Sequence, residues 1–210
     1  MLSISHKWNL ETDLDEPRKL YNSLFDQGEE MNDQDKMRLC KLIRNRVDTF
    51  ISEWKTNPSH WLQEIDVQCD LARRIHLLLK HQKADVLQAR HSHYQAEREF
   101  SRLTCEPYVS LGGAGTSYAH PDIVVWDDHD SRMTTLNSGK WPMVWACEIK
   151  YTTGEPDPTD LDRLRQMLRD KVLYVGCWIK LIVNTTTDMS DHDTTNDPNL
   201  WIIEERVSIQ

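Results

Sequence analysis

Apolar residues in the first half of the chain recur at steps of three and four, the spacing of amphipathic helices. They predict a helix over residues 32–54, which the Asn-Pro pair at 57–58 is expected to end. Ser59 is a candidate cap for a second helix that continues through residues 61–79. A third stripe with the same spacing predicts a helix over residues 84–103.

From residue 106 onward, the pattern changes to short apolar runs separated by polar segments, which is typical of buried strands. One amphipathic stretch, residues 157–170, predicts a helix among them. The expected strands cover residues 106–111, 122–126, 142–151, 175–184 and 200–205. This order predicts an α/β fold with a mixed central sheet flanked by helices. We expect an α-helical N-terminal region over residues 1–82 and a sheet-containing core over residues 83–210.

Composition is that of a folded globular protein. The chain has 210 residues, 39% of them hydrophobic, and eight Trp, which is enough for a sizeable core. No apolar run approaches the roughly 18 residues that a membrane span needs. The N-terminal residues lack the basic-then-apolar order of a signal peptide. We expect a soluble, cytoplasmic protein with no membrane partner.

The five cysteines form no Cys-x-x-Cys pair, so neither a disulfide framework nor a zinc site is expected. The net charge is −9, yet residues 71–104 carry seven basic and three acidic side chains. A solvated helix face and a local patch for phosphate groups both fit this basic segment. Arg163, Arg165 and Arg169 either line a cleft for phosphates or face solvent.

Charged residues stand at the ends of two of the most apolar strands. Asp122 opens the run 122–126, and Glu148 and Lys150 lie near the end of the run 142–151. Because side chains alternate along a strand, Glu148 and Lys150 share one face. A buried carboxylate without a partner is costly, so Glu148 needs Lys150 or a divalent cation beside it. Pairing of the two strands would place Asp122 next to Glu148.

Two carboxylates and a lysine at strand ends suit Mg²⁺ or Mn²⁺. Such an ion can bind a phosphate oxygen and lower the pKa of a bound water, while the lysine orients that water or offsets charge on phosphorus. The simpler alternative is an ordinary salt bridge between Lys150 and Glu148, with Asp122 capping a turn.

The pattern His-Pro-Asp, 25 residues, Glu-Ile-Lys resembles the signature of the PD-(D/E)XK, or restriction-endonuclease-like, nuclease superfamily. Pro121 and Asp122 match its first half, and Glu148 and Lys150 match its second half. The resemblance covers roughly residues 84–184, and the expected order of elements is similar to that superfamily's αβββαβ core.

This resemblance implies a restriction-endonuclease-like fold and a phosphodiesterase that uses Mg²⁺ or Mn²⁺. It implies that Asp122, Glu148 and the backbone carbonyl of Ile149 bind the metal ion. Lys150 would be the catalytic base or would stabilise charge. Glu-Trp-Lys at residues 53–55 has the same spacing as Glu-Ile-Lys, but it ends an expected helix and no Pro-Asp strand precedes it.

Many members of the superfamily add an acidic residue from the helix before the first strand. In the helix expected over residues 84–103, Glu97 is the first candidate for this catalytic and metal-binding role, and Glu99 is the second. The helix after Glu-Ile-Lys often contributes a polar residue, for which Gln166 is the candidate. In the related cap-snatching endonucleases of segmented negative-strand RNA viruses, a helical His is a further metal ligand, and His91 resembles it.

Together these features predict a nuclease that hydrolyses phosphodiester bonds of DNA with Mg²⁺ or Mn²⁺. One alternative is a Mn²⁺-dependent endoribonuclease of the cap-snatching type. A second alternative is a nucleic-acid-binding or assembly module on the same fold, with weak catalysis or none. Nucleic acid is the expected partner, DNA in preference to RNA, and a homodimer would suit the cleavage of both strands.

Overall fold

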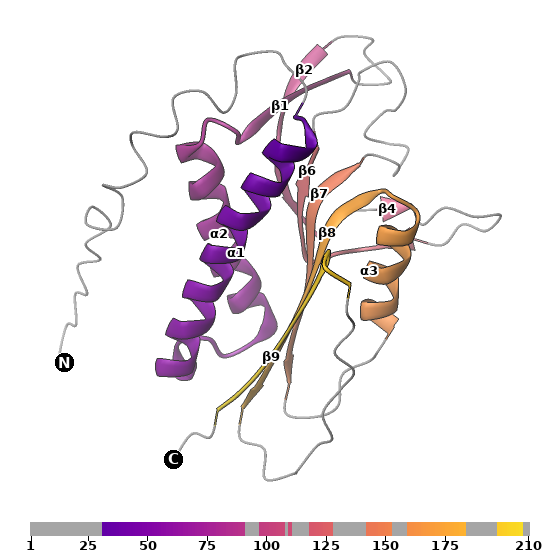
Figure 1. Cartoon of the computed structure of the whole chain (residues 1–210). Helices are drawn as coiled ribbons and strands as arrows, with labels where there is room; N and C mark the ends of the chain where they lie inside the picture. The colour runs from indigo at the N-terminus through magenta and orange to yellow at the C-terminus, as the bar shows by residue number, and fades with distance from the viewer. Residues whose placement is uncertain are drawn as a thin grey trace.

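The computed structural model describes residues 31–90, 97–107, 109–110, 118–127, 142–152, 159–183 and 197–207. Within them, helices α1 (Asp33–Thr56) and α2 (Glu64–His81) cover one face of a central sheet, and α3 (Thr159–Arg169) covers the other (Figure 1). A 3-10 turn, Pro58–His60, lies between α1 and α2. The described chain therefore forms an α/β fold in three layers.

The central sheet has five strands in the order β3-β6-β7-β8-β9. β3 pairs with β6, and β6 with β7, in antiparallel orientation, whereas β7 pairs with β8, and β8 with β9, in parallel. The sheet is therefore mixed and open. Its strands are β3 (Leu103–Cys105), β6 (Ile123–Trp126), β7 (Met143–Thr152), β8 (Leu173–Val183) and β9 (Leu200–Val207).

Two smaller antiparallel pairs accompany this sheet. The first joins β1 (Val86–Arg90) to β2 (Glu97–Ser101), with Val86 opposite Ser101. The second joins β4 (Val109–Ser110) to β5 (Tyr118–Ala119). In the described ranges, neither pair is hydrogen-bonded into the five-stranded sheet.

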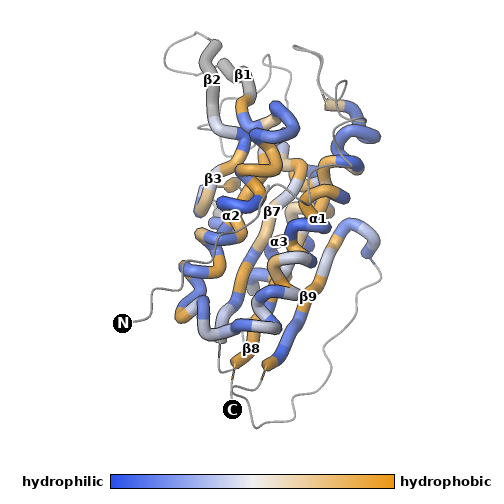
Figure 2. The backbone as a smooth tube through the Cα atoms, turned by 90° about the vertical axis from the view of Figure 1, so that its left-hand side faces the viewer, coloured by the Kyte–Doolittle hydropathy of each residue, from blue (hydrophilic) through white to orange (hydrophobic). Residues whose placement is uncertain are grey.

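The alternation of side chains along the strands gives the central sheet two apolar faces. Trp145, Cys147 and Ile149 of β7 belong to the hydrophobic cluster that includes α1 and α2. Ala146 of β7 and Trp178 of β8 belong to the second cluster, with residues of α3. Figure 2 shows the hydrophobic segments of the strands running between the helices. β7 and β8 are apolar on both sides because helices cover both faces of the sheet.

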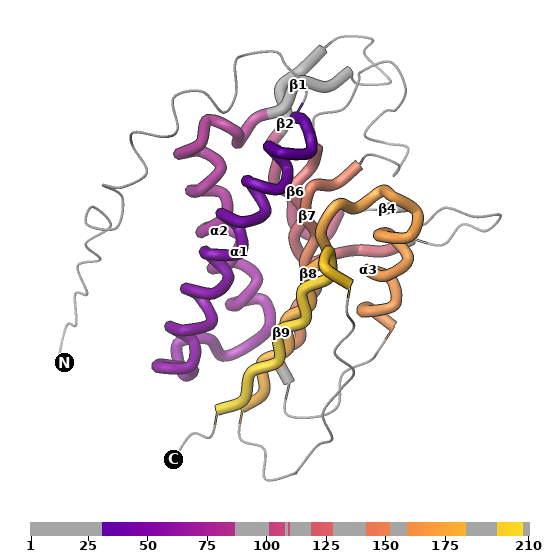
Figure 3. Tube along the Cα trace, viewed as in Figure 1, coloured from indigo at the N-terminus to yellow at the C-terminus, as the bar shows by residue number. Residues whose placement is uncertain are grey.

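Segments far apart in the sequence pack side by side. α1, indigo in Figure 3, lies against β9, yellow in the same view, and Lys55 pairs with Glu205 at 2.8 Å. Helices α1 and α2 share one hydrophobic cluster with the sheet. The expected division of the chain between residues 82 and 83 stays a prediction. None of the helices in the described ranges is both long and apolar enough to cross a membrane.

Most of the elements expected from the apolar pattern are confirmed. The helix expected over residues 32–54 is α1, and it ends before Asn57. The later expected strands correspond to β6, β7, β8 and β9, and the helix expected between them is α3. The second helix begins later than expected, at Glu64, so Ser59 is not its cap. The carboxylate of Asp66 accepts the N–H of Leu62 at 2.9 Å and closes its first turn.

The prediction of a helix over residues 84–103 is wrong, because its described residues form β1, β2 and the start of β3. Helix α2 ends before Lys83, which takes a left-handed φ of 55°. The buried guanidinium of Arg102 donates to the carbonyls of Ala84 at 2.7 Å and Trp126 at 3.1 Å. These long-range contacts tie the ends of the β1–β2 pair to β6 and override the local helical spacing.

The strand expected over residues 106–111 is shifted and divided. β3 ends at Cys105, and Glu106 has a left-handed φ of 49°, which a strand does not accommodate. The chain returns to extended structure at Val109, in β4. The N–H of Glu106 still donates to the carbonyl of Asp122 at 3.2 Å, which continues the pairing of Cys105 with Ile123 by one residue before the chain leaves β6.

Candidate active site at the open edge of the central sheet

The candidate site lies where the pairing of β6 with β7 stops and β7 continues. In the described sheet, β6 pairs with β7 only as far as Cys147. Beyond this point, two carboxylates accept the N–H groups of β7. Asp122 Oδ2 accepts the N–H of Ile149 at 2.6 Å, and Glu64 Oε2 accepts the N–H of Tyr151 at 3.1 Å. The starts of α2 and β6 therefore both bring an acidic group to one edge of β7.

The place where β6 stops pairing with β7, beside Asp122 and Glu64, forms a corner of the sheet. Glu148 is buried at this corner, on the α3 face of the sheet, and only 3% of it is exposed. In the described part of the chain, its carboxylate forms no hydrogen bond or ion pair. Burial raises the pKa of Glu148 to about 9, and the negative charges of Asp122 and Asp160 act in the same direction. The positive charges of Lys150 and Arg163 oppose this effect. A buried carboxylate in such surroundings is costly unless a cation joins it.

Asp122 is held through its main chain as well as its side chain. The buried amide of Gln68, on α2, donates to the carbonyl of Asp122 at 2.8 Å, beside the N–H of Glu106. Burial raises the pKa of the Asp122 carboxyl to about 6, and the charge of Glu64 also raises it, whereas the hydrogen bond from Ile149 lowers it. These contacts fix the position of the carboxylate relative to β7.

Lys150 brings a positive charge to the same corner. Its Nζ lies 2.9 Å from Asp160 Oδ2 and 3.8 Å from Glu64 Oε1. Burial alone would lower the pKa of Lys150, but the hydrogen bond and charge of Asp160, with Glu64 and Asp122, raise it above its ordinary value. The ammonium is therefore charged at neutral pH. Of the two roles expected for Lys150, this favours charge stabilisation over general-base catalysis.

The donors at this edge are all oxygen atoms. Asp122 and Glu148 supply carboxylates, and the carbonyl of Ile149 lies on the edge where its N–H meets Asp122, because both groups of a strand residue face the same edge. Among the residues that the structure describes, no three His, Cys, Asp or Glu side chains are grouped so that they could hold a metal ion. The fit of Mg²⁺ or Mn²⁺ rests on the oxygen donors and on Glu148, which is buried beside Asp122 and has no hydrogen-bond or ion-pair partner for its carboxylate among the described residues.

Three of the residues singled out from the sequence meet at this corner: Asp122, Glu148 and Lys150. The sequence predicts Glu97 on a helix before the sheet, and this prediction is wrong, because Glu97 lies on the strand β2. His91 lies outside the described residues, so its role as a metal ligand stays a prediction.

Two secondary candidates are also placed by the structure. Glu99, like Glu97, lies on β2 instead of a helix. The side chain of Gln166 is engaged within α3, where its amide donates to Asp170 at 2.9 Å and its carbonyl accepts from Arg169 at 2.7 Å. In the described part of the chain, no hydrogen bond or ion pair joins Gln166 to Lys150, so Gln166 is not part of the corner.

Glu64 and Asp160 are the two site residues that the sequence did not reveal. Each stands in the first turn of a helix, Glu64 in α2 and Asp160 in α3. A signal for Glu64 exists, because on a helical face it lies in line with the buried Gln68, Leu71 and Ile75. A carboxylate in line with buried residues of a helix indicates a partner on the sheet that the helix covers. Asp160 has no comparable signal, since its neighbour Asp162 is equally acidic.

The basic segment over residues 71–104 is partly used for structure. Arg74 pairs with Glu53 at 2.7 Å and with Asp70 at 3.0 Å. Arg102 is buried and donates to main-chain carbonyls. These two guanidinium groups hold helices and strands together, which supports a structural use for part of this segment.

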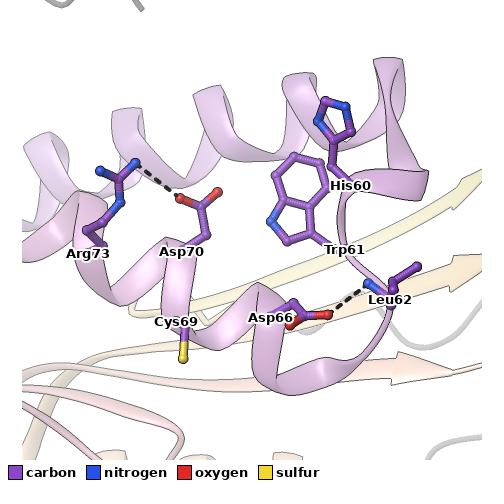
Figure 4. Close-up of a pocket in the computed structure, with 7 residues that line it drawn as sticks. All are labelled: His60, Trp61, Leu62, Asp66, Cys69, Asp70 and Arg73. Atoms are coloured by element: carbon purple, nitrogen blue, oxygen red, sulfur yellow. Dashed lines mark hydrogen bonds and ion pairs between the residues drawn. The ribbon is translucent and has the colours of Figure 1, made fainter. Parts of the chain in front are cut away.

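An open depression of about 470 Å³ lies beside the 3-10 turn and α2 (Figure 4). It is lined by His60, Trp61, Leu62, Asp66, Cys69, Asp70 and Arg73. The hydroxyl of Tyr151 donates to the carbonyl of Trp61 at 2.7 Å, so the rim of the depression is joined to the strand that carries Lys150. None of the charged residues of the corner lines it.

Comparison of the chain with protein-family models, with curated proteins and with solved structures finds no match. The function is therefore inferred from the geometry and electrostatics of the corner between β6 and β7.

Proposed function

We propose that the chain is a metal-dependent nuclease of the PD-(D/E)XK type that hydrolyses phosphodiester bonds of DNA. The observation that carries the proposal is the buried carboxyl group of Glu148 beside Asp122, with the charged Lys150 at the same corner. Glu64 adds a further carboxylate. Oxygen donors of this kind suit Mg²⁺ or Mn²⁺, and an adjacent ammonium suits the phosphate that such an ion would bind.

The order of the elements supports the same proposal. When the separate pairs β1–β2 and β4–β5 are set aside, the chain order is helix α2, strands β3, β6 and β7, helix α3 and strand β8. This is the αβββαβ order that the resemblance implies for a restriction-endonuclease-like core. In this assignment α2 is the helix before the first strand, and Glu64 takes the role that the sequence suggested for Glu97. The strand β9 extends the core at its parallel edge.

A bound Mg²⁺ or Mn²⁺ would supply Lewis-acid polarisation of a phosphate oxygen and a water of lowered pKa. Asp122, Glu148 and the carbonyl of Ile149 would hold the ion. Lys150 would stabilise the negative charge that develops on the phosphate oxygens as water attacks phosphorus and the bond to the leaving oxygen breaks. The hydrogen bonds from Gln68 and Glu106 would keep Asp122 in place during this change.

The experiment is a cleavage panel with single- and double-stranded DNA and RNA, with Mg²⁺, Mn²⁺ or EDTA. The unchanged protein is expected to cleave DNA only with a divalent cation. Lys150→Ala is expected to lower the rate by about 100-fold or more, the size seen when a group that stabilises transition-state charge is removed. Asp122→Asn is expected to lose cleavage at a low metal concentration, because a metal ligand is missing. Lys55→Ala is the matched control, because Lys55 belongs to the other Glu-x-Lys segment and pairs with Glu205 away from the corner.

Activity that survives both substitutions would refute the proposed site. Preference for single-stranded RNA with Mn²⁺ would replace DNA by RNA as the substrate and support the cap-snatching alternative. Binding of DNA without any metal-dependent cleavage would support the binding or assembly module instead of the nuclease.

A further inference from the structure

Asp160 joins two cations at the edge of the candidate site. Its Oδ2 lies 2.9 Å from Lys150 Nζ, and its Oδ1 lies 2.8 Å from Arg163 Nη1. Only 14% of the Asp160 side chain is exposed, against 69% for Asp162, which lies two residues further along the first turn of α3 and pairs with Arg165. Asp160 is thus the one of these two similar residues that faces the sheet.

A lysine side chain has four rotatable bonds and needs a partner to hold its ammonium in one place. For Lys150 the nearer of its two carboxylate partners is Asp160, since Glu64 is 3.8 Å away. Asp160 is itself well anchored, because it stands in the first turn of α3, where the helix dipole favours a negative charge. The helix α3 is in turn fixed to the sheet by the buried Leu164 and Met167.

We propose that Asp160 is a positioning residue that holds Lys150 and Arg163 as a pair of cations facing the phosphate group. This inference rests on the proposed nuclease function. Lys150 then acts on the charge that develops at phosphorus, and Arg163, whose side chain is 44% exposed, contacts a phosphate oxygen from the solvent side. Asp160 touches neither the reacting atoms nor the metal ion, and acts through the two cations.

A role as a metal ligand would give a different kinetic result. Removal of a ligand raises the concentration of metal ion needed for half-maximal rate, and the rate recovers when the ion is in excess. Removal of a positioning residue lowers kcat, because Lys150 spends less time in the position from which it stabilises charge on the phosphate. It leaves the metal requirement unchanged.

The test compares Asp160→Asn and Asp160→Glu with Asp162→Asn, the control on the same turn. In Asp160→Asn, kcat is expected to fall about 10- to 100-fold, while the half-saturating Mg²⁺ concentration stays within about twofold. Asp160→Glu, which keeps the charge, is expected to lie between Asp160→Asn and the unchanged protein. Asp162→Asn is expected to behave like the unchanged protein in every measurement.

A second readout needs no activity. Acetylation by acetic anhydride, followed by mass spectrometry of the peptide that carries Lys150, is expected to be several-fold faster in Asp160→Asn, because the amine is released from its carboxylate. Unchanged acetylation of Lys150, or a rise in the Mg²⁺ requirement with full recovery of kcat, would overturn the inference. If the unchanged protein cleaves no nucleic acid, the nuclease proposal fails, and the acetylation rates still decide whether Asp160 holds Lys150.

Discussion

The stability of the metal-free protein should depend on pH through Glu148, and Glu148→Gln isolates this dependence. Burial and neighbouring carboxylates raise the pKa of Glu148 from an ordinary 4.5 to about 9. The folded protein therefore keeps a proton on this group that the unfolded chain releases above pH 4.5. Stability from this source is fully present below pH 4.5 and is lost progressively as the pH rises toward 9.

The size of the effect follows from the distance between the two pKa values. Each pH unit between them costs about 1.4 kcal/mol, so the free energy of unfolding falls by roughly 3 kcal/mol between pH 4.5 and pH 7 on account of Glu148. Because 97% of the residue is withdrawn from water, screening by solvent reduces this figure little. Glutamine has nearly the same shape and carries no proton to lose. Glu148→Gln should therefore be the more stable protein at pH 8, and the advantage should shrink toward pH 5.

Urea unfolding in EDTA at pH 5, 6, 7 and 8 measures this difference for the two proteins. Asp162→Asn serves as the control, since its side chain is 69% exposed and its stability should follow that of the unchanged protein. Adding Mg²⁺ at pH 8 should stabilise the unchanged protein and not Glu148→Gln. A difference between the two proteins that stays constant from pH 5 to pH 8 would refute the reasoning, because it would mean that Glu148 does not hold a proton in the folded state.

Three further predictions follow from contacts around the site and the sheet. Gln68→Leu removes the amide that donates to the Asp122 carbonyl. It should lower the free energy of unfolding in urea by about 1–2 kcal/mol and should also lower the cleavage rate. Gln166→Leu, the control, should change neither quantity. Lys180 is fully buried, and its Nζ lies 3.3 Å from the carboxylate of Glu204. Glu204→Gln removes this charge and should lower the free energy of unfolding by roughly 3 kcal/mol. Lys180→Met, which removes the buried cation itself, should lower it by less. Binding of Mn²⁺ at pH 7 should release about one proton per ion from Glu148. Calorimetry in two buffers of different ionisation enthalpy measures this proton release.

The strands that carry the site could be predicted from the sequence, because their apolar runs are long and their ends are polar. β6 and β7 pack on helices at both faces, so every residue from Met143 to Cys147 is apolar, and the charges of Glu148 and Lys150 stand out. The convergence of Asp122, Glu148 and Lys150 needs only that these two strands pair, as they do. This part of the site therefore follows from the local pattern of apolar residues and from the pairing of β6 with β7.

The rest depends on contacts between distant segments, which the spacing of apolar residues does not contain. The stripe over residues 84–103 fits a helix as well as a strand pair, and the choice is made by Arg102 and by pairing with β6. The error placed Glu97 on a helix, where the structure has the strand β2, and overlooked that α2 is the helix that comes before the strands. Glu64 and Asp160 reach the corner only because α2 and α3 begin beside the end of β7, which is a matter of tertiary packing.

The dependence of DNA cleavage on Mn²⁺ concentration tests the proposed metal site most directly, when it is measured for the unchanged protein, Asp122→Asn and Glu148→Gln. The unchanged protein should show no cleavage in EDTA and a rate that saturates as Mn²⁺ is added. Each variant should need at least about 10-fold more Mn²⁺ for the same rate, because a ligand is missing. Cleavage in EDTA, or curves for the two variants that coincide with that of the unchanged protein, would contradict a metal-dependent nuclease at this corner of the sheet.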